Sequence, residues 1–163
     1  ELGMSRAVKV KASILTSDPY QERDLVMPDV NSCTRKAAKE AYEMAGLGAD
    51  DIDLVELHDC FTTNEVVTYE GLGLCEEGEA TKFIDDGNNT YGGEFVVNPS
   101  GGLMSKGHPI GATGLAQCYE LVNQLRGNSG QRQVDGAKIA LQHNLGLGGA
   151  VVVTMYQRMY GKS

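Results

Sequence analysis

Three segments of the chain place a reactive side chain at the end of an apolar run, beside residues that favour turns. In the first segment, His58 and Cys60 directly follow the apolar run Ile52–Leu57. Side chains at the carboxyl end of a strand in an α/β sheet commonly face a ligand-binding crevice. A helix that begins just after Cys60 would lower the pKa of its thiol and favour the thiolate. The pattern also fits a structural histidine and a core cysteine, so both interpretations stay open.

The second segment, Asn98–Gly114, surrounds His108 with two clusters of glycine. Pro109 fixes the backbone directly after the histidine, and glycines such as Gly107 permit a ligand to approach the backbone closely. A histidine held in this way can donate a hydrogen bond to a substrate oxygen. Its stretch GHPIGATG, at 107–114, lacks the lysine of a P-loop and follows no strand signal, so it fits neither nucleotide-binding fingerprint. The alternative is a glycine-rich turn into a helix, with an incidental histidine.

The third segment, Leu141–Gly149, contains His143, Asn144 and Gly146. Backbone amide groups that are left accessible by glycines such as Gly146 could line an anion-binding site. A plain hairpin turn fits this pattern equally well, so the segment alone does not decide between a site and a turn.

The composition indicates one globular domain over residues 1–163, with 41% hydrophobic and 22% charged residues. A net charge of −8 argues against a nucleic-acid surface, yet it permits a phosphate-bearing ligand at a local basic spot. No apolar run approaches the roughly 20 residues that cross a bilayer, and no signal peptide is visible. The four cysteines lack the spacing of a zinc or CxxC site, so we expect no metal and a reduced, intracellular chain. Outside the first segment, Cys33, Cys75 and Cys118 are weaker candidates, more typical of core or surface positions.

Hydrophobic periodicity predicts an α/β fold, a mixed sheet with helices on its faces. The predicted strands are 7–15, Ile52–Leu57, Lys138–Gln142 and Ala150–Tyr156. The predicted helices run from Asn31 or Ser32 to about Ala45, from Thr62 or Thr63 to about Leu72, and from Gly111 to Arg126. The stretch from Cys75 to Ser105 is predicted to be rich in loops, and Leu145–Gly149 to form a hairpin turn.

The three segments together resemble the C-terminal half of thiolases. Asn98–Gly114 is similar to the Gly-His-Pro block of that family, and Leu141–Gly149 falls where the family has its Cys-x-Gly block. HDCF, at 58–61, falls where many thiolases have Asn-Glu-Ala-Phe. This wording, with NTYGGEFVVNPSGGL and ALQHNLGLGGAVVVT, is similar specifically to thiolases of the sterol-carrier type. The match runs from about residue 30 to 157 and implies a thiolase-like half with a five-stranded mixed sheet.

The resemblance implies a role for each matching residue. His108 would help to form an oxyanion hole for the thioester oxygen and would activate a nucleophilic cysteine. His58 stands where the family has the asparagine that holds a water of that oxyanion hole. Cys60 would take over the acid/base proton transfer, because Gln142–Gly149 contains no cysteine. Gly107, Asn144 and Gly146 are the expected substrate-binding residues, whereas the role of His143 stays open.

The activity implied is acyl transfer, in which coenzyme A, as a substrate and not a cofactor, cleaves a 3-oxoacyl-CoA. The products would be acyl-CoA and acetyl- or propionyl-CoA, with branched chains among the substrates and the peroxisome, otherwise the cytoplasm, as the location. The nucleophile would come from an N-terminal thiolase half that these 163 residues do not contain, within a homodimer. The isolated chain is therefore expected to be inactive. Two alternatives are a ketosynthase-like condensing enzyme and a non-catalytic acyl-CoA-binding or scaffolding fragment.

Overall fold

One mixed sheet of five strands organises the chain. The computed structural model describes residues 6–17, 30–146 and 149–159. The strands are β1 (Val8–Ser17), β2 (Leu54–Glu56), β3 (Val96–Val97), β4 (Ile139–Gly146) and β5 (Ala150–Arg158), and they lie side by side in the order β1-β5-β4-β2-β3. The five-stranded mixed sheet of the sequence analysis is thus confirmed.

The pairing of the strands decides which loops meet. β5 is antiparallel to both β1 and β4, whereas β2 is parallel to β4 and to β3. In this register Glu56, the last residue of β2, lies opposite Gln142 of β4. Parallel strands end at the same edge of a sheet, so the segments that follow β2 and β3 emerge beside the carboxyl end of β4.

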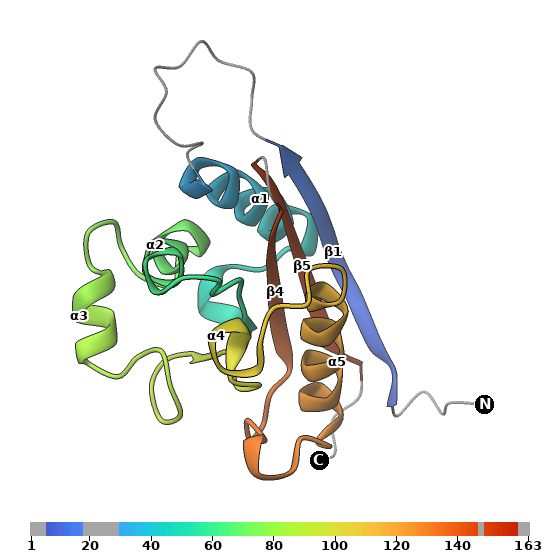
Figure 1. Ribbon diagram of the computed structural model, residues 1–163. Coiled ribbons are helices and arrows are strands. Elements are labelled where there is room, and N and C mark those ends of the chain that lie inside the picture. Colours follow the sequence, from blue (N-terminus) through green and yellow to red (C-terminus); the bar gives the residue numbers. More distant parts are fainter. Residues whose placement is uncertain (1–5, 18–29, 147–148, 160–163) are drawn as a thin grey trace.

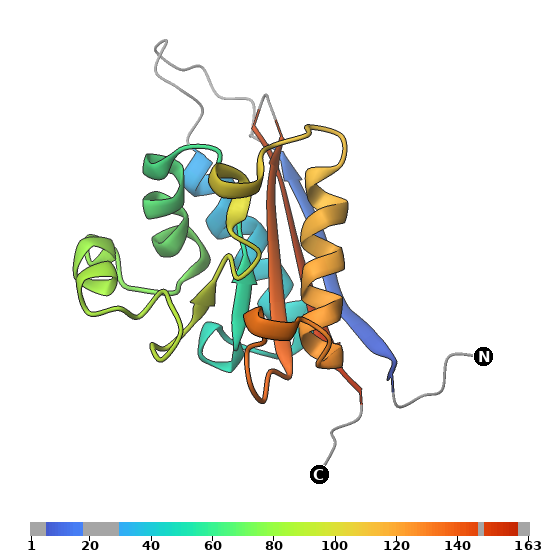
Figure 2. The same cartoon turned by 60° about the horizontal axis from the view of Figure 1, so that its bottom comes forward.

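Helices cover both faces of the sheet (Figures 1 and 2). The longer ones are α1 (Val30–Ala45), α2 (Thr62–Leu72) and α5 (Thr113–Arg126). The shorter ones are α3 (Ala80–Asp85), α4 (Gly102–Lys106) and the 3-10 turns Ala49–Asp51 and Gly130–Arg132. α1 packs on one face and α5 on the other, while α3 stands farthest from β1 and β5 in both views.

Alternation along the strands divides the core between the two faces. On β2, Val55 joins the cluster under α1, while Leu54 joins the cluster under α5. Ala37 and Ala41 of α1 are both 0% exposed, and these small side chains let the helix lie close to the sheet. Leu121 is the matching fully buried contact of α5. Each helix therefore fixes one side of the strands that carry the candidate site.

The long helices and strands were predicted from the sequence, but three short elements were not. β3, α3 and α4 all lie within the stretch Cys75–Ser105 that was expected to be loop-rich. Each contains six residues or fewer, too few for a period of two or 3.6 to stand out. The hairpin turn was expected at Leu145–Gly149, but Leu145 and Gly146 belong to β4, because both pair with β5. Residues 147–148 lie outside the described residues.

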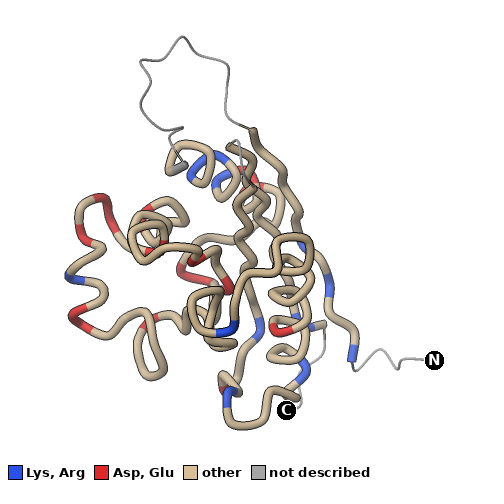
Figure 3. The backbone as a smooth tube through the Cα atoms, in the orientation of Figure 1, with Lys and Arg blue, Asp and Glu red and all other residues tan. Residues whose placement is uncertain are grey.

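Charge is distributed unevenly over the described chain (Figure 3). Between Thr62 and Glu94, Lys82 is the one basic residue, and acidic residues predominate over this α2–α3 segment. Such a segment offers no basic surface for a nucleic-acid backbone. Across the described ranges, each helix is too short or too polar to cross a lipid bilayer.

Candidate active site

The loop that follows β2 is held in place before it reaches the candidate residues. The backbone N–H of Leu57 donates a hydrogen bond to Oδ1 of Asn98, over 2.8 Å. His58 is then only 4% exposed and Asp59 only 2% exposed. The backbone carbonyl of His58 accepts a hydrogen bond from Nδ2 of Asn64 in α2. The segment therefore leaves the sheet in a defined direction.

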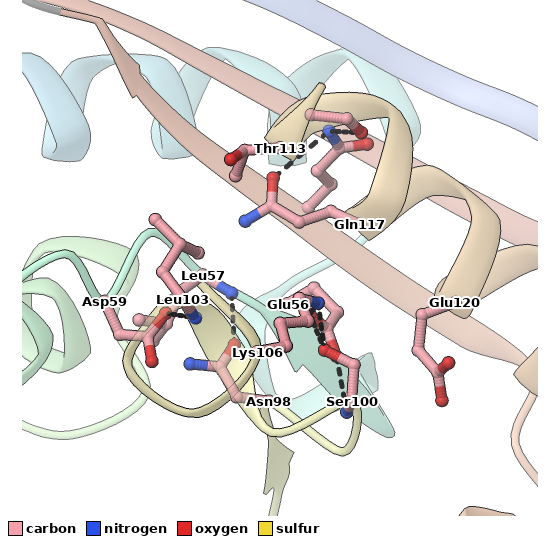
Figure 4. Close-up of polar contacts among 12 residues, drawn as sticks. Glu56, Leu57, Asp59, Asn98, Ser100, Leu103, Lys106, Thr113, Gln117 and Glu120 are labelled. Atoms are coloured by element: carbon pink, nitrogen blue, oxygen red, sulfur yellow. Dashed lines mark hydrogen bonds and ion pairs between the residues drawn. The ribbon is translucent and has the colours of Figure 1, made fainter. Parts of the chain in front are cut away.

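Asp59 joins this loop to α4. Its carboxylate accepts a hydrogen bond from the backbone N–H of Leu103, at 2.6 Å (Figure 4). It also accepts one from the backbone N–H of Met104, at 3.4 Å. Gly102 has a φ of +63°, and a Cβ at this position would collide with the same carboxylate. Because α4 leads directly to His108, Asp59 places the second candidate segment against the first.

A second buried carboxylate anchors both ends of α4. Glu56 is 0% exposed and accepts hydrogen bonds from the backbone N–H and the hydroxyl of Ser100, at 2.9 and 2.7 Å. Lys106, at the end of α4, lies 3.4 Å from the Glu56 carboxylate and also contacts the Ser100 hydroxyl (Figure 4). Burial raises the pKa of Glu56, and the neighbouring Lys106 cation counteracts that rise. The ion pair joins the end of α4 to the carboxyl end of β2, beside the turn that leads to His108.

His108 is exposed, but a contact with Thr113 orients its imidazole ring. Its Nδ1 lies 2.7 Å from the hydroxyl of Thr113, the first residue of α5. The Thr113 hydroxyl donates its single proton to the carbonyl of Pro109, over 3.3 Å. In the tautomer compatible with this bond, Nδ1 of His108 carries the hydrogen that Thr113 accepts, which leaves the lone pair on Nε2. This tautomer is suited to take a proton at Nε2.

His58 and His108 meet as a pair. Their ring centroids are 4.8 Å apart and the ring planes stand at 88°, an edge-to-face contact. Burial, together with the nearby His108, lowers the pKa of His58 to about 4, and the Asp59 carboxylate opposes this shift. His58 is thus neutral at physiological pH. Its Nδ1 is buried and has no hydrogen-bond partner among the described residues.

Cys60 lies two residues before the start of α2 and is half-buried. The expectation that the helix terminus would lower the pKa of this thiol is wrong, because burial raises it. Hydrogen bonds from the backbone at Phe61 and at Cys60 itself lower the pKa, but burial is the larger effect. The thiol is therefore protonated at neutral pH, in the form that can donate a proton.

The third segment supplies the end of β4. Nδ2 of Asn144 donates to Oε1 of Gln117 in α5, over 2.9 Å, so this side chain is turned towards the start of α5. Nε2 of Gln142 donates to the backbone carbonyl of Gly114, over 2.9 Å, on the same face. Gly146 is exposed at the strand end. The structure thus places Asn144 beside the helix that holds His108.

The glycine before His108 has a conformational reason. Gly107 has a φ of +94°, in the left-handed region that other residues rarely adopt, and it ends α4. The exposed backbone there turns the chain from α4 towards the histidine. The positive φ accounts for the glycine by itself, and its contact with a substrate stays a prediction.

The polar residues that support the site do not stand out in the sequence. Glu56, Asp59, Asn98, Thr113 and Gln117 each bond a candidate residue or its segment. A signal was present for Glu56, because a carboxylate inside an apolar run is rarely buried unless it is paired. Thr113 and Gln117 carried no comparable signal, since their partners are fixed only by how α5 meets the sheet.

The other cysteines lie outside the loops that bear His58 and His108. Burial and three nearby glutamates raise the pKa of Cys75 to about 11. Cys118 is half-buried within α5. Within the described part of the chain, no group of three or more His, Cys, Asp or Glu side chains is arranged to hold a metal ion.

The fold and the site define a thiolase-like half, with two histidines and a cysteine at the edge where β2 and β4 end. The thiolase C-terminal domain-like family matches residues 17–156, and the chain belongs to this family. Sterol carrier protein 2 of Rattus norvegicus is 56% identical over 156 residues, which cover 94% of this chain and 28% of that protein. Acetyl-CoA acetyltransferase of Methanothermobacter thermautotrophicus is 46% identical over 155 residues, covering 93% of this chain and 40% of that protein.

A solved structure shows the same fold. The Ltp2-ChsH2(DUF35) aldolase superposes with a TM-score of 0.79 at 24% sequence identity, over 91% of this chain and 39% of that one. The chain therefore spans well under half the length of these relatives.

Proposed function

We propose that this chain is the C-terminal half of a thiolase that cleaves a 3-oxoacyl-CoA with coenzyme A. The observation that carries the proposal is the edge-to-face contact of His58 and His108, with Cys60 two residues along the same loop. Membership of the thiolase C-terminal domain-like family and the relationship to an acetyl-CoA acetyltransferase support it.

Thioester cleavage needs a thiolate nucleophile, an oxyanion hole and an acid/base group. A cysteine from the N-terminal half supplies the nucleophile, and Nε2 of His108 accepts its proton. The thiolate attacks the 3-oxo carbon, and the negative charge develops on the carbonyl oxygen. The resulting imidazolium of His108 and the neutral ring of His58 donate hydrogen bonds to that oxygen. Each such donor stabilises the transition state by about 2.7–4 kcal/mol.

Cys60 completes the cycle as the acid. When the carbon–carbon bond breaks, the departing acetyl- or propionyl-CoA takes up a proton at its α carbon. The protonated thiol of Cys60 donates it, in keeping with the raised pKa. Coenzyme A then attacks the acyl-enzyme, and the same residue, now a thiolate, removes the proton from its thiol. Gly107, Asn144 and Gly146 would contact the substrate near this centre.

The surface around the site suits a protein partner. Five large apolar side chains are strongly exposed: Phe61 at 73%, Met104 at 49%, Ile110 at 77%, Leu115 at 74% and Tyr119 at 71%. All belong to α4, to α5, or to the loops that bear Cys60 and His108. Exposed apolar groups next to a site mark surfaces that another chain covers. The N-terminal thiolase half is the proposed occupant, within a homodimer.

Coenzyme A and its thioesters are substrates, and no further cofactor is needed for the steps above. The resemblance to thiolases of the sterol-carrier type supports the peroxisome as the location and branched 3-oxoacyl chains as substrates.

One assay separates this function from its alternatives. Cleavage of acetoacetyl-CoA and of a 2-methyl-3-oxoacyl-CoA is measured with the chain alone and with an N-terminal thiolase half supplied. The proposal predicts CoA-dependent cleavage only when both halves are present. Binding of coenzyme A without cleavage would instead favour the non-catalytic fragment, and condensation coupled to decarboxylation would favour the ketosynthase-like enzyme.

A further inference from the structure

The chain contains a third histidine, His143, which contacts the backbone of the loop that bears His58. His143 lies on β4 and is 0% exposed. Its Nδ1 lies 3.4 Å from the backbone nitrogen of His58 and accepts the hydrogen bond from that N–H. Its Nε2 lies 3.1 Å from the hydroxyl of Thr34, which is buried in α1. A fully buried polar ring with two such partners carries a structural task that the catalytic cycle above does not use.

The partners fix the protonation of this ring. A backbone N–H can only donate, so Nδ1 of His143 must be the unprotonated nitrogen. Nε2 then carries the hydrogen and donates it to the hydroxyl of Thr34. Burial and the neighbouring His58 lower the pKa of His143 to about 3, which keeps the ring neutral. One tautomer of the neutral form satisfies both neighbours.

The position of His143 explains why a side chain is used here. The pairing of β2 with β4 ends at Glu56 and Gln142, so the backbone of His58 has already left the ladder. A buried N–H without a partner destabilises the fold, and the imidazole of the next β4 residue supplies the missing acceptor. The hydrogen bond from the His58 N–H to the His143 ring therefore joins β4 to the loop after β2, one position beyond the last backbone pair.

We infer that His143 is the positioning residue that sets the backbone at His58 and so aims the His58 imidazole at His108. The connection runs from Thr34 in α1, through His143 in β4, to the loop after β2. The backbone carbonyl of His143 also accepts a hydrogen bond from Nε2 of Gln117 in α5, over 3.1 Å. The inference rests on the proposed function for its kinetic consequence, and on hydrogen bonding alone for its structural consequence.

Two substitutions separate the two bonds of the ring. In His143→Asn, the amide oxygen can take the place of Nδ1 and accept from His58, while the link to Thr34 is lost. His143→Leu keeps a similar volume but removes both bonds. The control is Gln124→Leu, which removes an equally buried polar side chain that binds Val134 and Arg132, at the far end of α5.

The structural readout needs no enzyme activity. In the 163-residue chain, nitrogen chemical shifts of the histidine rings should show His143 as the Nε2–H tautomer between pH 5 and pH 8. Hydrogen exchange of the His58 amide should be at least tenfold faster in His143→Leu than in the unchanged chain or in Gln124→Leu. An Nδ1–H tautomer, or an equal rate of exchange in all variants, overturns the inference.

The kinetic readout uses the complete enzyme, with the N-terminal half supplied. Misplacement of a reacting group by about 1 Å costs on the order of 100-fold in rate, so kcat should fall by that order in His143→Leu. KM should change little, and His143→Asn should recover most of kcat. A normal kcat in His143→Leu contradicts the inference, whereas a complete enzyme that cleaves no substrate even without substitutions contradicts the proposed function and leaves the exchange result standing.

Discussion

The imidazole of His58 meets that of His108 edge to face, with ring centroids 4.8 Å apart and planes at 88°. The two residues are fifty positions apart in the sequence, and no direct hydrogen bond joins the two rings among the described contacts. Buried carboxylates instead hold the two segments together, Asp59 through the start of α4 and Glu56 through both of its ends. The buried carboxylates of Asp59 and Glu56 therefore determine how the two imidazole rings are aligned.

Replacement of Cys60 by alanine should remove the acid without disturbing the fold. In the complete enzyme, turnover of acetoacetyl-CoA should fall by about 100- to 10,000-fold, the usual contribution of general acid–base catalysis. Stability should change little, because the thiol is only half-buried. Steady-state cleavage and urea unfolding check the two expectations. Cys75→Ala, at a half-buried cysteine away from the site, serves as the control, and a Cys60→Ala enzyme as fast as this control would remove Cys60 from the mechanism.

Loss of the Thr113 hydroxyl should release the tautomer of His108. Thr113→Val keeps the shape of the side chain but provides no acceptor for the Nδ1–H of His108. We expect kcat to fall by roughly tenfold or more, because the lone pair on Nε2 is no longer enforced. Thr113→Ser should restore the activity. Nitrogen shifts of His108 report the tautomer directly, and an unchanged Nδ1–H population in Thr113→Val would contradict the assignment.

Acid should destabilise the chain through its buried histidines. The folded-state pKa values of His58, about 4, and His143, about 3, lie below the usual value of 6.5. The unfolded chain therefore binds more protons as the pH falls below about 6.5, and the stability present at neutral pH is lost from there towards pH 4 and pH 3. The slope is about 1.4 kcal/mol per pH unit for each histidine inside its window.

Urea unfolding of the chain at pH 7, 6 and 5 measures this slope. His143→Asn should reduce the slope, because one of the two buried histidines no longer titrates. A slope that is the same with and without His143 would show that the ring is not held neutral by burial.

Gly102 should tolerate no side chain. Gly102→Ala adds a Cβ at a φ of +63° and drives it into the Asp59 carboxylate, so the free energy of unfolding should fall by about 1–3 kcal/mol. Gly111→Ala is the matched control: it lies in the same glycine-rich segment, and a Cβ there meets no atom within 4 Å. Denaturant midpoints of the two variants test the difference, and equal midpoints would mean that Asp59 does not hold α4.

Much of the fold was predictable, because its long elements carry their own periodicity. The alternation of β1 and the apolar face of α5 arise from local sequence, and both elements were placed within a few residues. The candidate residues His58, Cys60 and His108 stood out because each lies beside a turn at the end of an apolar run or a glycine cluster.

The support of the site was not predictable from the same patterns. Asp59 bonds residues more than forty positions away, and the tautomer of His108 depends on where α5 begins. The pKa of Cys60 was predicted in the wrong direction, because the distance to a helix is visible in a sequence but the depth of burial is not. Long-range contacts of this kind are settled only by the three-dimensional packing.

The most direct test of the account is the rate at which the complete enzyme acylates its nucleophilic cysteine. Rapid-quench mass spectrometry of the N-terminal half, after mixing with acetoacetyl-CoA, follows the acyl-enzyme as it forms. If His108 accepts the proton of the nucleophile and helps to stabilise the oxyanion, His108→Ala should slow this step by at least about 100-fold. An unaltered rate of acylation in His108→Ala would contradict the pairing of His58 and His108 as the centre of the site.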